Sequence, residues 1–279
     1  MNPDRIYSQY RDDALAKQAT ATEYTTFVAM PFKDQFSYRS RQVYVDVIQA
    51  AATSANTLNK TPRHFAKPKR ADDGAGTAIV ITEQIVSDML HAHVFLGDLT
   101  FQNAGVLLEV GIAMGLKPNP QIILITQGDV RDLHFDIRNN NVMSYNPADA
   151  VPKLADAMVA SALSFETEVD RYIDSIEKTL TPEAIVTLNF YGRLWRDNPG
   201  LEPSLHDGIA GEVFPHARAQ ERLEASTREL LARRLIFTDY KAGAIQGGDL
   251  YGMHATELGW AVIAHIWPEL KRANGKSTP

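Results

Sequence analysis

Residues 24–163 alternate short apolar runs with stretches of helical periodicity, and this alternation limits the chain to few folds. The runs Tyr24–Met30, His93–Leu99 and Gln121–Thr126 are rich in β-branched and aromatic residues, and a polar turn follows each of them. Strands that are separated by helices pair in parallel, because a parallel crossover needs a long connection. We therefore expect an α/β domain with a doubly wound, Rossmann- or flavodoxin-like parallel sheet.

Weaker patterns fill the spaces between these runs. They predict strands at His64–Ala66 and Asn141–Tyr145, and helices at Arg41–Ser54, Ile79–Met89, Gly105–Leu116 and Pro147–Leu163. The second of these strands is short and is expected at an edge of the sheet.

After Ser164 the alternation stops and helical patterns dominate. The sequence predicts helices at Glu166–Leu180, Pro182–Trp195, Ala219–Arg234 and Thr256–Trp267, two strands near Leu235–Asp239 and Leu250–His254, and a turn-rich connection at Asp197–Pro215. A helix, a hairpin and a helix in this order are typical of a winged helix. We divide the chain into an N-terminal extension at 1–22, an α/β domain at 23–164 and a mainly helical, winged-helix-like domain at 165–279.

Composition excludes several classes of protein and site. The 279 residues include no cysteine, which rules out disulfides, thiolate nucleophiles and cysteine-ligated zinc. The net charge of −6 argues against a surface that attracts nucleic acid as a whole. No apolar run approaches the roughly 18 residues of a membrane span, and the polar start Met1–Asp13 lacks the apolar core of a signal peptide. We expect a cytoplasmic protein that makes no membrane contact.

Two acids flank the turn that follows the run His93–Leu99. Asp98 ends the run, and Glu109 falls in the first turns of the next predicted helix. Ligands of open α/β sheets bind outside the carboxyl ends of the strands, so both carboxylates are candidates for an active site. Each also has a structural alternative, Glu109 as a solvent-facing helix acid and Asp98 as a cap of the turn. The small residues Gly111 and Ala113 favour close approach of a ligand to Glu109.

These motifs resemble the nucleoside 2-deoxyribosyltransferase-like proteins, which are relatives of TIR domains. The matching segments, over about the first 150 residues, are Phe27–Phe32, Arg70–Asp72, Gly97–Thr100, Asn103, Glu109–Ala113, Ile122–Gln127 and Phe135–Arg138. The chain departs from the superfamily at Ala104 and Gly105, where Pro-Asn is usual, and at Leu108, where an aromatic residue is usual.

The resemblance implies cleavage or transfer at the N-glycosidic bond of a nucleoside, a nucleotide or NAD. Glu109 matches the acid that attacks or stabilises the anomeric carbon, and Asp98 is the candidate second acid. Such a reaction passes through an oxocarbenium-like state, which a carboxylate stabilises or traps. We place the substrate contacts at Met30, Pro31, Phe32, Arg70, Asp72, Asn103 and Gly111.

No cofactor and no metal are expected. The segment Gly74-Ala75-Gly76 lacks the dinucleotide fingerprint, so NAD enters only as a substrate or ligand. His91 and His93 share one face of a strand, but no third ligand is suggested near them.

Arginines in the second domain leave another function class open. Those on or beside the helix predicted at 219–234 are Arg218, Arg222, Arg228, Arg233 and Arg234. They favour contact with a DNA backbone, but glutamates on the same helix reduce their net charge, so we favour a protein contact and expect a homo-oligomer. Three functions remain: an N-glycosidase or deoxyribosyltransferase-like enzyme, for instance in bacterial defence or nucleotide stress, a catalytically silent nucleotide sensor, and a DNA-binding regulator.

Overall fold

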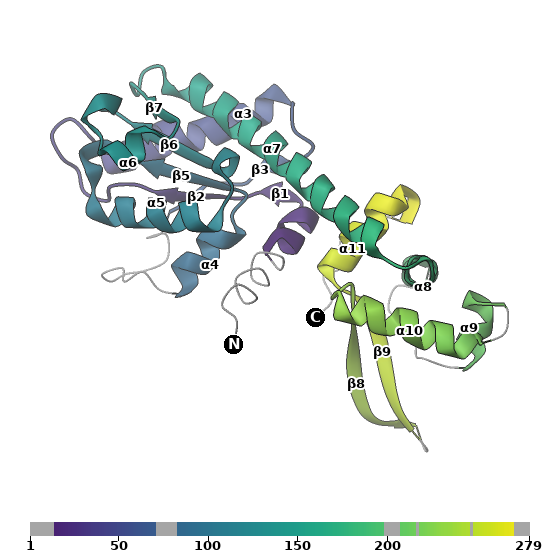
Figure 1. The fold of residues 1–279 in the computed structure, drawn as a ribbon. Helices are drawn as coiled ribbons and strands as arrows, with labels where there is room; N and C mark the ends of the chain where they lie inside the picture. Colours follow the sequence, from purple (N-terminus) through teal and green to yellow (C-terminus); the bar gives the residue numbers. More distant parts are fainter. Residues whose placement is uncertain (1–13, 71–82, 198–206, 216–217, 246–247, 271–279) are drawn as a thin grey trace. The chain divides into compact units, whose positions relative to one another are not determined.

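The computed structural model describes residues 14–70, 83–197, 207–215, 218–245 and 248–270 (Figure 1). Its internal contacts divide the chain into two compact units, Met1–Glu168 and Val169–Pro279. Within the described ranges, no helix has both the length and the apolar character needed to cross a membrane.

A five-stranded parallel sheet forms the centre of the first unit. Its strands lie in the order β4 (Lys69–Arg70), β2 (Thr26–Ala29), β5 (Val94–Asp98), β6 (Ile122–Thr126) and β7 (Val142–Ser144). A separate parallel pair joins β1 (Glu23–Tyr24) to β3 (His64–Phe65). The predicted α/β class with a parallel sheet is confirmed. The strand order is compatible with a Rossmann-like fold, and it reverses between β2 and β5.

Helices cover both faces of this sheet. They are α2 (Ser40–Gln42), η1 (Val43–Gln49), α3 (Ala50–Leu58), α4 (Glu83–His91), α5 (Ala104–Leu116), α6 (Phe135–Arg138) and α7 (Ala150–Thr179), with short 3-10 turns η2 (Thr100–Gln102), η3 (Asn119–Gln121) and η4 (Val130–Asp132). In Figure 1, α4 and α5 lie on one face of the sheet and α3 and α7 on the other. The π-helical segment η1 makes residues 40–58 one continuous helical run.

Close packing between α5 and β5 depends on a glycine. A Cβ atom at Gly97 would lie 2.8 Å from Val110 Cγ2 and 3.1 Å from Leu124 Cδ2. The stacked rings of Phe27 and Phe95, with centroids 6.0 Å apart, belong to the same core cluster. Because α5 packs against both β2 and β5, its buried face adjoins the point where the strand order reverses.

The opposite edge of the sheet, where the strands begin, holds a buried polar network. Gln18, in the helical stretch 14–20, donates from Nε2 to the carbonyl oxygens of Leu90 (3.1 Å) and Ala92 (2.6 Å). Lys117 Nζ donates to the same two carbonyls. His93 Nδ1 accepts a hydrogen bond from a backbone N–H, so its Nε2 is left to donate to the Gln18 carbonyl at 3.0 Å. These bonds tie the N-terminal stretch to the sheet.

The sequence prediction for the last helix of the first unit is wrong. Two helices were expected, at Pro147–Leu163 and Glu166–Leu180, but residues 150–179 form the single helix α7. The two residues between the predicted helices contain no helix breaker, and one of them, Phe165, is fully buried. The division between the two units therefore falls inside a helix.

The second unit contains helices around an antiparallel hairpin. Its elements are α8 (Pro182–Asp197), α9 (Asp207–Val213), α10 (Ala219–Ala232), β8 (Ile236–Ile245), β9 (Gly248–Ala255), α11 (Glu257–Ile266) and the 3-10 turn η5 (Pro268–Leu270). The predicted helices and hairpin are present. Helix α9 corrects the expectation of a purely turn-rich connection at Asp197–Pro215, where a seven-residue helix gives little periodic signal.

Candidate functional site

The carboxyl ends of β2 and β5 are the natural place for a ligand, because the strand order reverses between them. Met30, Pro31 and Phe32 continue the chain after β2, and Asp98 is the last residue of β5. Arg70 ends the edge strand β4, which pairs in parallel with β2. The fold thus brings these predicted residues to one edge of the sheet.

Asp98 is fully buried and is surrounded by hydrogen-bond donors. Its Oδ2 accepts from the hydroxyls of Tyr38 (3.0 Å) and Tyr145 (2.9 Å). Its Oδ1 accepts from the backbone N–H (3.0 Å) and the hydroxyl (2.5 Å) of Thr100. Both carboxylate oxygens are therefore engaged by the protein itself, as a structural carboxylate would be.

This network extends to the ends of β6 and β7. The Thr100 hydroxyl accepts from the backbone N–H of Gln127 at 3.0 Å, and Gln127 Nε2 donates to the Tyr145 hydroxyl at 3.1 Å. Tyr145 follows β7 directly, and Gln127 follows β6. The ends of three neighbouring strands are thus held together through Asp98.

Burial controls the proton equilibria of this network. It raises the pKa of Asp98, although the hydrogen bonds from Thr100 and the two tyrosines oppose the shift. Burial and the nearby Asp98 also raise the pKa values of Tyr38 and Tyr145 far above the usual range for a phenol. Both hydroxyls therefore keep their protons at neutral pH and remain donors to Asp98.

Arg70 places a cation beside this network. Its guanidinium carbon lies 5.4 Å from the ring centroid of Phe32 and 5.2 Å from that of Tyr44. Its charge acts on Tyr38, whose pKa it tends to lower against the effect of burial. The Arg70 residue is only 8% exposed, so its charge acts where water screens it weakly.

Glu109 lies on the buried side of α5. It is 6% exposed and shares this side with Val106, Val110 and Ala113. The structural alternative, in which Glu109 is a solvent-facing helix acid, is therefore wrong. Carboxylates are rarely this deeply buried, and because α5 packs against β2 and β5, Glu109 lies on the side of the helix that adjoins the strand reversal.

Two other residues predicted to contact the substrate, Asn103 and Gly111, do not lie on the buried side of α5. Asn103 is the N-cap of α5, and its Oδ1 accepts from the backbone N–H groups of Gly105 (3.0 Å) and Val106 (3.3 Å). Gly111 is exposed, and a Cβ atom added there would meet nothing within 4 Å. It does not share the buried side of Glu109, because a step of two residues turns an α-helix by more than half a circle. Asp72 lies outside the described residues.

Two exposed aromatic residues at this edge were not predicted from the sequence. Phe36 and Phe101 are 79% and 41% exposed, and their ring centroids lie 5.7 Å apart. The Phe101 ring also meets Tyr38 edge-on at 5.6 Å. Both phenylalanines have positive φ angles, 50° and 64°, a strained conformation for bulky side chains. Strain of this kind gathers at functional sites.

Comparison of the chain with protein-family models, with curated proteins and with solved structures finds no match.

Proposed function

We propose that the first unit is an enzyme that cleaves or transfers the N-glycosidic bond of a nucleoside, a nucleotide or NAD, with Glu109 as its catalytic carboxylate. The observation that carries this proposal is the burial of Glu109 on the side of α5 that adjoins the strand reversal. A buried carboxylate suits an oxocarbenium-like transition state, because low dielectric strengthens its attraction for the developing positive charge.

Neighbouring groups suit the rest of such a substrate. The exposed rings of Phe36 and Phe101 offer stacking surfaces for a base. Arg70 offers a cation for a phosphate group. Asp98 takes a positioning role, since its oxygens already accept four hydrogen bonds and hold the tyrosines in place. Ala104 and Gly105, which stand where the superfamily usually carries Pro-Asn, begin α5 and leave its Asn103 cap intact.

Release of free base tests this proposal. The purified protein is incubated with NAD, ribonucleotides and deoxynucleosides, alone and in pairs with a second free base, and the products are separated by chromatography. Glu109→Gln is expected to lower turnover by roughly 10²–10⁴-fold, because the substitution removes the negative charge while keeping the shape. Products formed only in the presence of the second base identify transfer rather than hydrolysis.

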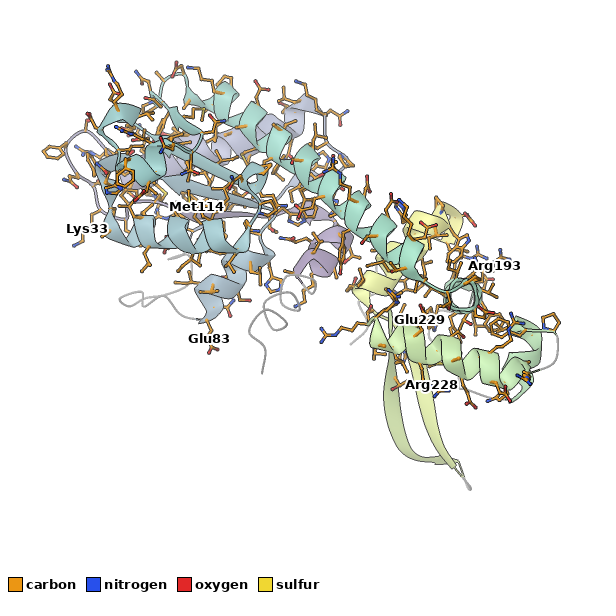
Figure 2. All side chains as sticks on the ribbon, in the orientation of Figure 1. Lys33, Glu83, Met114, Arg193, Arg228 and Glu229 are labelled. Atoms are coloured by element: carbon orange, nitrogen blue, oxygen red, sulfur yellow. The ribbon has the colours of Figure 1, made fainter. Side chains whose placement is uncertain are left out.

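A matched variant separates catalysis from general damage. Glu83→Gln makes the same chemical change at an exposed position at the start of α4 (Figure 2) and is expected to leave turnover unchanged. Thermal unfolding confirms that both variants are folded. No base release from any substrate, or equal turnover in Glu109→Gln and the wild type, would contradict the enzymatic proposal.

A nucleotide sensor without activity is the second candidate. It is favoured by the four protein hydrogen bonds that occupy Asp98, because Asp98 is then not available as the second acid that assists proton transfer. A nucleotide or NAD that raises the melting temperature of the protein without releasing base would support it.

For the second unit we propose a winged-helix-like module that binds protein, including a second copy of this chain. At least three of the five arginines on or beside α10 form ion pairs: Arg218 with Glu221 (3.9 Å), Arg222 with Glu183 (3.1 Å) and Arg233 with Glu229 (3.2 Å). Paired arginines contribute little to phosphate binding, so we expect no salt-dependent binding to duplex DNA. Such binding at low salt would favour the regulator instead.

A further inference from the structure

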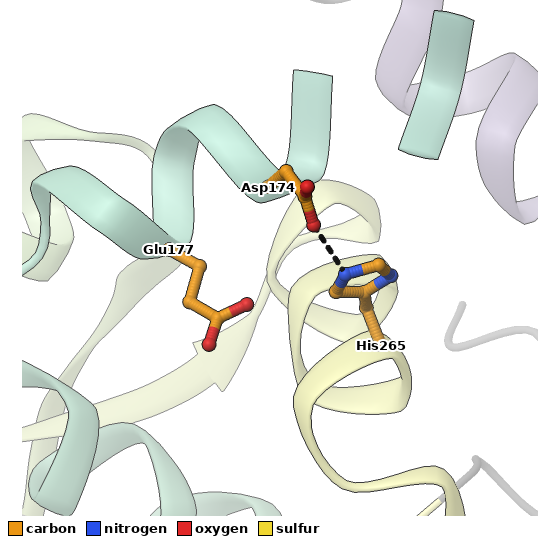
Figure 3. A group of neighbouring side chains, drawn as sticks. All are labelled: Asp174, Glu177 and His265. Atoms are coloured by element: carbon orange, nitrogen blue, oxygen red, sulfur yellow. Dashed lines mark hydrogen bonds and ion pairs between the residues drawn. The ribbon is translucent and has the colours of Figure 1, made fainter. Parts of the chain in front are cut away.

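We propose that Asp174, Glu177 and His265 of the second unit form a binding site for one zinc-type divalent metal ion. The two acids lie three residues apart on α7 and so project from the same side of that helix. The histidine comes from the last turn of α11. Figure 3 shows all three side chains gathered in one place. The inference does not depend on the function proposed for the first unit.

Distances among the three side chains are close to those of a metal site. His265 Nε2 lies 3.0 Å from Asp174 Oδ1, and one ligand atom from each residue lies within 4.8 Å of the others. In a tetrahedral zinc site, ligand atoms are about 3.3 Å apart, since each bond is about 2.0–2.1 Å. The first pair already meets this spacing. Glu177 is only partly buried, and its side chain would have to rotate to bring its carboxylate from within 4.8 Å to this spacing.

The donor set selects the class of ion. Two carboxylates balance the double positive charge, and an imidazole nitrogen is a ligand that zinc accepts readily and that magnesium and calcium seldom use. The nitrogen also distinguishes this group from an ordinary cluster of surface acids. Three protein ligands leave one tetrahedral position for water.

One neighbouring cation competes with the metal. Lys178 Nζ lies 3.5 Å from Asp174 Oδ2, one helical turn from that acid. This ammonium group repels a bound cation and must turn toward solvent, which it can do because its side chain is 76% exposed. Its removal is therefore expected to strengthen metal binding, the opposite of what loss of a ligand would do.

Metal binding would join the end of α7 to α11. Both belong to the unit Val169–Pro279, and the hydrogen bond between Asp174 and His265 already links them. A ligand that binds only the folded state stabilises it, so zinc is expected to raise the melting temperature of the protein.

Calorimetric titration of the full-length, untagged chain with zinc chloride tests the site. One zinc ion is expected per chain, and His265→Gln and Glu177→Gln are each expected to weaken its binding at least about 10-fold. Glu177→Gln leaves the hydrogen bond between Asp174 and His265 in place, so it separates metal binding from damage to the fold. Lys178→Met is expected to tighten binding several-fold. Magnesium chloride is expected to produce no saturable binding at this site.

A second histidine beside an acid provides the control. His134 Nδ1 lies 3.3 Å from Asp136 Oδ2, and both side chains are exposed. His134→Gln is expected to leave zinc affinity unchanged. With cobalt as probe, the visible absorption of a tetrahedral site is expected from the wild type and lost in His265→Gln. Failure of the wild type to bind zinc, or equal affinity in His265→Gln and the wild type, would overturn the proposal.

Discussion

Phe101 combines an exposed side chain with a left-handed backbone, and its proposed role is to stack on a base. Phe101→Gly removes the strain of a left-handed conformation, about 1–2 kcal/mol, but also the contacts with Phe36 and Tyr38. The free energy of unfolding is therefore expected to change by less than about 1 kcal/mol. Affinity for a stacking nucleotide is expected to fall by about 1–3 kcal/mol, measured by titration calorimetry.

An exposed phenylalanine in the second unit serves as the control for this substitution. Phe237 is 47% exposed, and Phe237→Ala is expected to leave nucleotide affinity unchanged. If Phe101→Gly binds nucleotides as tightly as the wild type, the aromatic group is not a stacking surface.

Tyr145 shows the cost of breaking the Asp98 network. Tyr145→Phe deletes one of the four hydrogen bonds to Asp98 and removes the hydroxyl that accepts from Gln127 Nε2. We expect a loss of about 1.5–3 kcal/mol in the free energy of unfolding, as for a hydrogen bond to a charged group. Urea denaturation of the variant measures this loss, and an unchanged midpoint would show that Asp98 does not depend on Tyr145.

Local sequence identified Asp98 and Glu109 but not the tyrosines that hold Asp98. Tyr38 and Tyr145 lie far from Asp98 along the chain, in a loop and after an edge strand, and no periodicity connects them. Only the parallel register of the sheet brings them together. Asn103 and Gly111 were assigned to a ligand because sequence alone cannot say which side of a helix a residue faces until the buried side is known.

At the scale of elements, contact between α5 and β5 positions Glu109. A methyl group at Gly97 would force Val110 and the helix outward, so Gly97→Ala is expected to cost about 1–3 kcal/mol of unfolding free energy and to lower turnover. Gly111→Ala, on the exposed side of the same helix, is expected to add about 0.5–1 kcal/mol and to leave turnover unchanged. Chemical denaturation and the base-release assay measure both effects. A drop in turnover for Gly111→Ala would restore its predicted ligand contact.

The long apolar strands of the sheet were predictable, and the short strand β4 was not. The apolar runs that became β2, β5 and β6 carry enough β-branched residues to be recognised. Strand β4 has only two residues, Lys69 and Arg70, so it has no period to detect, yet it brings Arg70 to the site. The single helix α7 was divided in two because a change of composition near Ser164 resembled a boundary.

For the molecule as a whole, acid is expected to destabilise the fold through His93. Burial lowers its pKa from 6.5 to about 4, so the unfolded chain takes up this proton before the folded one does. The contribution of neutral His93, about 3 kcal/mol, is fully present above pH 6.5 and is lost as the pH falls through 4. Urea denaturation between pH 7.5 and 4.5 measures this loss.

Two histidine variants test whether His93 causes this loss of stability in acid. His93→Gln is expected to be less stable at pH 7.5 but to lose less stability on acidification. His64→Gln, at an exposed position on β3, is expected to keep the pH dependence of the wild type. Equal pH dependence in His93→Gln and the wild type would assign the acid sensitivity to other groups.

Helix α7 affects how proteases can cleave the chain and how one unit could be separated from the other. The two units share these 30 residues, and buried Phe165 and Val169 flank the division between them. A protease that needs an extended segment finds no exposed linker at this point, and a genetic exchange that moved one unit to another protein would have to cut a helix in half. The junction between the two units is therefore expected to resist limited proteolysis.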